Sequence, residues 1–208
     1  RIGYTHYTMG PLPTGFQWQF VETEDDLYLC SVVLTGKLST CQSYTLNTSV
    51  ADGLEDWVRA GGKFYYQNEY QGCGAASAAA LAMSHAGSTM TAGNTFVAAS
   101  GGEVNDGETL GGYTATDNGQ FCVAGLTWRG GAADTCIGGT ALIEAPPYIT
   151  GGLQVRPGGT VLAGEKVGEG AVFLSGDSDL PLFQNTSGPD TWKTFIQRLA
   201  TYSASSLI

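Results

Sequence analysis

The pattern of apolar and polar positions predicts a series of short strands at the start of the chain. Residues 1–7 alternate loosely before a segment rich in Pro and Gly, and residues 16–21 suit a second strand. Residues 27–35 are apolar almost without interruption, which is typical of a strand covered on both faces of a parallel sheet. We therefore expect residues 27–35 to form a central strand.

Helical spacing of apolar residues begins after this strand. Residues 49–62 carry apolar side chains at intervals of three and four; Thr48 or Ser49 can cap this segment, and Gly61 and Gly62 can end it. We expect a helix here.

An aromatic strand at 63–69 and an Ala-rich helix at 74–85 follow. The order strand, helix, strand, helix predicts an α/β fold with a doubly wound, mostly parallel sheet and right-handed crossovers.

The composition changes in the middle of the chain. Residues 88–158 are rich in Gly, Thr and Asp and contain short β-like pieces, which predicts a β-rich insertion or sub-layer. The α/β pattern returns at 159–164 and 168–177, and a final helix is expected at 190–202. The length of 208 residues suits one domain covering 1–208.

Charge excludes some partners. The net charge is −10, with 9 Lys and Arg scattered along the chain, so no basic stripe is available to bind nucleic acid. No apolar run approaches the roughly 20 residues that cross a bilayer, so membrane insertion is not expected. The chain begins at Arg1 rather than Met, which suggests that a preceding segment has been removed.

The cysteines suggest an oxidising compartment. Cys30 with Cys41, and Cys122 with Cys136, are close enough in sequence to form local disulfides, which leaves Cys73 unpaired. We therefore expect an extracellular location, or display on the surface of a cell or virus particle.

Two segments resemble the class I glutamine amidotransferase-like superfamily, and more narrowly its non-catalytic branch. They are Leu54-Glu-Asp-Trp-Val-Arg-Ala-Gly-Gly62 before a strand, and Val161-Leu-Ala-Gly-Glu-Lys-Val-Gly-Glu-Gly-Ala-Val-Phe-Leu-Ser-Gly-Asp-Ser-Asp179 before the last helix. The likeness covers residues 27–87 and 159–202. It implies a flavodoxin-like, glutamine amidotransferase-like sheet.

Active members of that superfamily carry a nucleophilic cysteine in a Gly-x-Cys-x-Gly turn between a strand and a helix, where the positive helix N-terminus favours a thiolate. The corresponding positions here are Gln71-Gly72-Cys73-Gly74. In an enzyme, Cys73 would attack the substrate and the Gly74 amide would help to hold the oxyanion. The alternative is a small residue that closes a turn.

The base that such a cysteine needs is missing from its usual place. The superfamily has His-x-Glu at the end of a late strand, whereas this chain has Gly176-Asp177-Ser178-Asp179. The remaining candidates are His6 and Asp177, because His85 would lie about 18 Å along the helix from Cys73. The sequence therefore predicts a broken catalytic triad.

Other candidate sites are weaker. Asp177 and Asp179 can bind Ca²⁺ at a strand end, and so can Glu103, Asp106 and Glu108 in a loop, but both patterns are also ordinary turns. No cofactor is expected.

Trp128 and Arg129 are candidates for an exposed contact with a protein or a glycan. The leading hypothesis is a non-catalytic structural or binding module that self-assembles or binds a protein partner. The alternatives are a cysteine amidohydrolase or amidotransferase that uses Cys73, and a carbohydrate-binding adhesive module.

Overall fold

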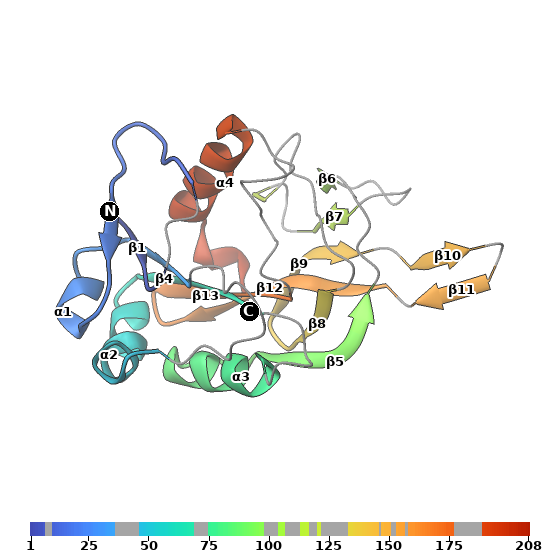
Figure 1. Cartoon of the computed structure of the whole chain (residues 1–208), viewed down its shortest axis with the longest axis horizontal. Coiled ribbons are helices and arrows are strands. Elements are labelled where there is room, and N and C mark those ends of the chain that lie inside the picture. The colour runs from blue at the N-terminus through green and yellow to red at the C-terminus, as the bar shows by residue number, and fades with distance from the viewer. Residues whose placement is uncertain are drawn as a thin grey trace.

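A computed structural model places the chain in an α/β fold (Figure 1). The structure describes residues 1–6, 10–35, 46–68, 75–97, 104–106, 113–116, 120–121, 133–145, 147–150, 153–156, 158–176 and 189–208. Its helices are α1 (Glu24–Leu27), α2 (Thr48–Arg59), α3 (Ala75–His85) and α4 (Pro189–Thr201), and a 3-10 turn follows at Ala204–Ser206.

Most strands of the described chain belong to one sheet of nine, in the order β2-β1-β3-β4-β13-β12-β9-β7-β6. These strands are β1 (Ile2–Tyr4), β2 (Trp18–Phe20), β3 (Val32–Leu34), β4 (Lys63–Gln67), β6 (Val104–Asp106), β7 (Tyr113–Ala115), β9 (Thr140–Ala145), β12 (Gly159–Val167) and β13 (Gly170–Ser175). The five strands from β2 to β13 are parallel to one another, whereas β12 is antiparallel to β13 and to β9. The sheet is therefore mixed, with a parallel half that comes from the two ends of the chain.

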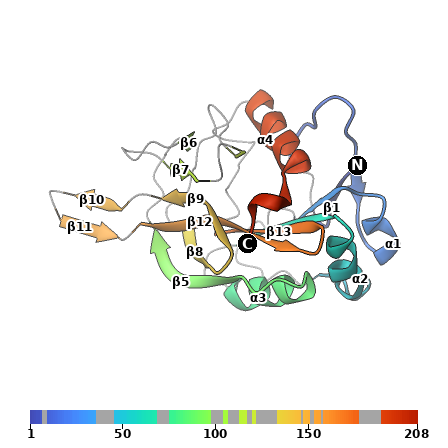
Figure 2. The same ribbon diagram turned by 180° about the vertical axis from the view of Figure 1, so that it is seen from behind.

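The segment 88–158 contributes to this sheet and also forms two smaller ones. Strands β9, β7 and β6 extend the main sheet beyond β12. The pairs β5 (Thr91–Val97) with β8 (Ala133–Ile137), and β10 (Tyr148–Thr150) with β11 (Leu153–Arg156), are separate two-stranded sheets. Figure 2 shows the β10–β11 pair projecting from one end of the molecule.

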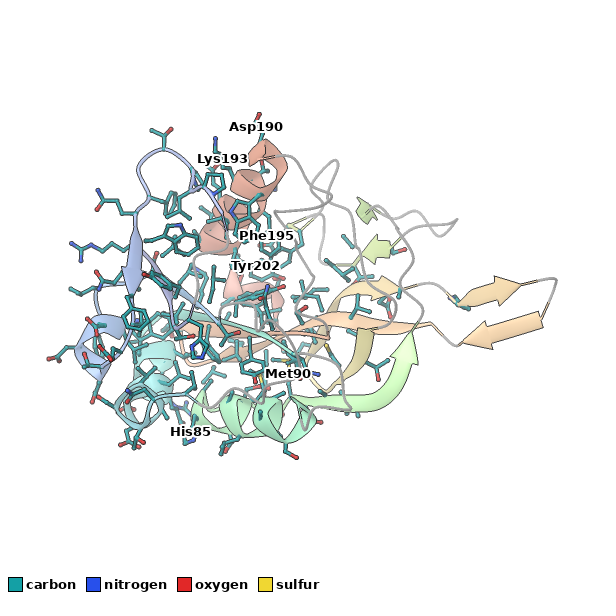
Figure 3. All side chains as sticks on the ribbon, in the orientation of Figure 1. His85, Met90, Asp190, Lys193, Phe195 and Tyr202 are labelled. Carbon is teal, nitrogen blue, oxygen red and sulfur yellow. The ribbon has the colours of Figure 1, made fainter. Side chains whose placement is uncertain are left out.

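Helices cover both faces of the parallel half. Figure 1 shows α4 on one side of the sheet and α2 and α3 on the other. One face packs Tyr65 and Phe173 against Trp192 and Phe195 of α4. Figure 3 shows Phe195 and Tyr202 directed from the C-terminal segment toward the sheet, and Asp190 and Lys193 at the outer end of α4.

The opposite face is covered by α1, α2 and α3. Its core joins side chains of all three helices to alternate residues of the strands. The largest of these helix side chains is Trp57 of α2, whose Nε1 donates to the Cys30 carbonyl oxygen at 3.3 Å. Alternate residues of β4 face opposite sides of the sheet. Tyr65 lies in the core beneath α4 and Tyr66 in the core beneath α1, α2 and α3, as expected for a strand buried on both sides.

Several predicted elements are confirmed with small changes of boundary. The helices expected at 49–62, 74–85 and 190–202 are α2, α3 and α4. The side chain that caps α2 is Asn47, which accepts from Ser49 N at 3.0 Å.

The strand predicted at 27–35 is wrong in its first half. Glu24–Leu27 form helix α1, because Thr23 and Asp26 make a reciprocal capping box that satisfies the amide groups at the helix start. Tyr28 and Leu29 are exposed, and only Val32–Leu34 form the fully buried strand. The last strand, β13, is parallel to β4 and antiparallel to β12, with a hairpin turn at Gly168 (φ +61°) between β12 and β13.

Gly170 makes a close contact between β13 and α2. A methyl group there would collide with the carbonyl oxygens of Val58 and Gly62, and the next amide, Ala171 N, donates to Gly62 O at 3.1 Å. We expect Gly170→Ala to lower the free energy of unfolding by about 1–3 kcal/mol, because backbone atoms cannot rotate away as side chains can. Urea unfolding measures this, and a midpoint equal to that of the unsubstituted chain would contradict the contact.

Candidate functional site

The carboxyl ends of four neighbouring parallel strands lie at the same edge of the sheet. Strands β1, β3, β4 and β13 are in parallel register, with Tyr4 opposite Leu34, Leu34 opposite Tyr65, and Tyr65 opposite Phe173. Open α/β sheets bind ligands at this edge, because the loops that leave the strands enclose a crevice there.

Buried polar side chains gather at the same edge. Six polar side chains of the described residues are buried, and five of them end or directly follow one of these four strands. We call these five the carboxyl-edge row: Thr5, Thr35, Gln67, Asn68 and Ser175. A buried polar group is costly unless it is hydrogen-bonded, so a cluster of them inside an apolar core needs an explanation.

Hydrogen bonds join the row across three strands. Thr35 Oγ1 accepts from Gln67 N at 2.8 Å, and Thr35 N donates to Tyr65 O at 3.0 Å. Asn68 N donates to Ser175 O at 2.9 Å. These bonds continue the strand pairing past the last regular residues, and the bond from Gln67 N also holds the Thr35 side chain in place.

Tyr65 contributes a phenol beneath the row. It is fully buried, and burial raises the pKa of its hydroxyl well above the ordinary value, although a side-chain hydrogen bond with Ser175 opposes the shift. The phenol therefore stays protonated at neutral pH.

Thr5 directly follows β1, at one end of the row. Its side chain is 7% exposed, and its Oγ1 has no hydrogen-bond partner within the described part of the chain. The Thr5 carbonyl oxygen lies 2.7 Å from His6 Nδ1, and the His6 side chain is exposed. The contact with the Thr5 carbonyl oxygen orients the His6 ring, but it does not involve the Thr5 hydroxyl.

Most residues proposed from the sequence lie outside the described residues. These are Cys73, Gly74, Asp177, Asp179, Trp128, Arg129, Glu103, Glu108, Cys41 and Cys122. Asp106 ends β6, at the far edge of the main sheet from β1. Of the two histidines, His6 follows β1 at the carboxyl edge, and His85 is the last residue of α3.

The predicted disulfide at Cys30 is wrong, because the Cys30 thiol is free and buried. Its Sγ donates to Asp26 O at 3.4 Å and packs in the core between α1 and the sheet. Cys136 is likewise a buried thiol, and it donates to Leu174 O at 3.2 Å. The predicted disulfide between Cys122 and Cys136 is therefore wrong as well. Packing and weak hydrogen bonds hold the thiols of Cys30 and Cys136 inside the protein.

No three His, Cys, Asp or Glu side chains of the described segments lie close enough together to hold a metal ion. No helix of the described segments is long and apolar enough to cross a membrane.

The sequence interpretation missed the carboxyl-edge row. Its signal was present, because Thr5, Thr35 and Ser175 each come at the end of an apolar strand. These residues were overlooked because they do not titrate and match no catalytic motif.

Comparisons with known proteins add distant structural likenesses. No family model and no curated protein matches the chain. A β-galactosidase from Rahnella sp. R3 is similar at 15% identity and TM-score 0.45, over 89% of this chain and 24% of that one. A β-galactosidase from Bacillus circulans sp. alkalophilus is similar at 16% identity and TM-score 0.49, over 88% of this chain and 24% of that one. The chain thus spans about a quarter of the length of these enzymes.

Thr35 allows a direct test of the row. Replacing it in Thr35→Val removes the oxygen that accepts from Gln67 N and leaves this buried amide without its acceptor. We expect a loss of about 1–3 kcal/mol in the free energy of unfolding, measured with urea. Thr35→Ser keeps the oxygen and should lose clearly less; equal losses in the two variants would contradict a role for this hydrogen bond.

Cys30 gives a second test. Burial raises the pKa of the Cys30 thiol to about 11. We expect iodoacetamide at pH 8 to label Cys30 roughly a hundredfold more slowly in the folded chain than in urea, because only the thiolate reacts. Peptide mass spectrometry separates Cys30 from the other cysteines.

The same shift predicts a pH dependence of stability. The folded state keeps the Cys30 proton at pH values where the unfolded chain has lost it, so this contribution is complete below about pH 9 and is lost as the pH rises toward 11. Cys30→Ala should flatten this decline. Equal labelling rates in the folded and unfolded chain would contradict the burial of the thiol.

Proposed function

We propose that this chain is a non-catalytic binding module built on a doubly wound sheet of the flavodoxin-like, glutamine amidotransferase-like type. The order β2-β1-β3-β4-β13 of parallel strands supports this fold, because it has the form 2-1-3-4-5 that flavodoxin-like sheets share.

The coverage of the two faces supports the same fold. After β1 the chain packs Leu12 and Phe16 on the face that also holds α4. After β2, β3 and β4 it forms α1, α2 and α3, which cover the opposite face. A doubly wound sheet distributes its connections in this way, and here the segment 10–17 stands where a first helix would be.

The observation that carries the functional proposal is the chemistry of the carboxyl-edge row. Its five side chains are hydroxyls and carboxamides, which donate and accept hydrogen bonds but do not exchange protons near neutral pH. General acid-base catalysis needs a group whose pKa lies near the working pH. Side chains of this kind suit binding better than proton transfer.

The role of Cys73 follows from the same proposal. We propose that Cys73 closes the turn between β4 and α3 rather than attacking a substrate, since the superfamily's His-x-Glu is replaced by Asp177-Ser178-Asp179. Binding of a protein partner and display outside the cell stay predictions from the sequence. The prediction of display outside the cell depended on two disulfides, and neither disulfide forms, because Cys30 and Cys136 are thiols.

Hydrolysis assays test the proposal. We expect the purified chain to show no turnover of glutamine, amide or ester substrates above that of Cys73→Ala, because a thiol without a base remains a weak nucleophile. Cys30→Ala serves as the matched control for loss of a thiol elsewhere. A Cys73 thiol with a pKa well below 8, whose alkylation abolishes hydrolysis, would overturn the non-catalytic assignment.

A further inference from the structure

We propose that the carboxyl edge beside β1 and β3 binds a neutral, polyhydroxylated ligand, such as a sugar unit, with the Thr5 hydroxyl as one of its hydrogen-bonding groups. This inference rests on the proposed binding function and names its ligand class.

Thr5 lies where the connections of two adjacent parallel strands separate. The neighbouring strands β1 and β3 send the chain to opposite faces of the sheet: Phe16 packs with α4, whereas α2 packs on the other side. Where the connections of adjacent parallel strands separate in this way, a crevice remains between them at the carboxyl ends. Thr5 directly follows β1, and Thr35 directly follows β3.

The hydroxyl of Thr5 is available to a ligand. Thr35 Oγ1 is engaged by Gln67 N at 2.8 Å, whereas Thr5 Oγ1 has no partner in the described part of the chain although only 7% of the residue is exposed. A buried hydroxyl without a partner is destabilising, so a bound ligand that supplies the missing hydrogen bond would be favoured.

The sheet below Thr5 is closed. Gly3 lies two residues earlier on the same face of β1, and an added Cβ there would lie 2.8 Å from Val21, 2.9 Å from Val33 and 3.0 Å from Cys30 Sγ. Apolar side chains therefore fill the space under Gly3. The space on the amino side of Thr5 is therefore closed to a ligand.

Charge selects a neutral ligand over an anion. Among the described cations, Arg1 and Lys63 lie at the amino ends of β1 and β4, and Lys63 Nζ donates to Ala200 O at 2.9 Å. The whole chain carries a net charge of −10, which repels phosphates and carboxylates. Hydroxyl and amide side chains match sugar hydroxyls as both donors and acceptors.

The aromatic rings of β1 and β2 lie on the other face of the sheet. The Tyr4 ring lies 5.7 Å from that of Trp18 and 5.4 Å from that of Phe20, measured between centroids. Because Gly3 and Thr5 share one face of β1, Tyr4 projects from the opposite face, where Ile2 and Trp18 also pack. The ligand that we propose at Thr5 is therefore recognised through hydroxyl and amide groups.

Titration of the isotope-labelled full chain tests the inference by NMR. Free monosaccharides, short oligosaccharides representing glycans, and inorganic phosphate are added separately. We expect at least one saccharide to shift the amide signals of Thr5 and Thr35. Thr5→Val should weaken that binding about tenfold, Thr5→Ser should largely keep it, and Thr201→Val, at the C-terminal end of α4, should leave it unchanged.

Thermal unfolding supplies a readout that does not depend on the ligand. Thr5→Val should melt at the same temperature as the unsubstituted chain or higher, because it replaces an unpartnered hydroxyl with a methyl group of similar size. Thr35→Val should melt lower. A lower melting temperature for Thr5→Val would show that a protein group uses the hydroxyl, and would overturn the inference.

The remaining outcomes separate this inference from the proposed function. Absence of any saccharide shift, or a shift with phosphate alone, would overturn the ligand class while leaving a non-catalytic chain. Hydrolysis that depends on Cys73 would overturn the proposed function instead, whether or not a saccharide binds at Thr5.

Discussion

The structure depends on burying a parallel sheet on both of its faces. Strands β3, β4 and β13 pack apolar or aromatic side chains alternately against α4 and against α2 and α3, so neither face of these strands can hold polar groups along its length. Polar side chains are confined to the positions where the strands end. The carboxyl-edge row is a direct consequence of this constraint.

The same constraint explains why the row is both rigid and neutral. Its members lie at the rim of an apolar core, where a charge would need an ion partner or remain costly, and hydroxyl and amide groups can be satisfied by neighbouring backbone. Thr35 uses this solution, because its Oγ1 accepts from Gln67 N. Thr5 is the position that we connect to a ligand, because its hydroxyl has no partner in the described part of the chain.

The sequence predicted much of the parallel half because its signals are local. Helical spacing and glycine stops located α2, and the aromatic run located β4. Two features of the fold depend on interactions that the pattern of apolar residues does not reveal. The capping box of Thr23 with Asp26 turns the start of an apolar run into α1, and the pairing of β13 with β12 is set by a hairpin that brings distant β-rich segments to the sheet.

The candidate site was less predictable than the fold. Short spacing between cysteines favoured disulfides, but packing against α1 and β13 keeps Cys30 and Cys136 as buried thiols. Catalytic motifs drew attention to Cys73, whereas the row consists of side chains with no motif. We propose that this edge binds a ligand without acid-base chemistry. A crystal structure tests this proposal through the distance from Cys73 Sγ to the nearest titratable side chain. We expect no His, Asp or Glu within about 5 Å, and an imidazole or carboxylate within hydrogen-bond reach of that sulfur would contradict it.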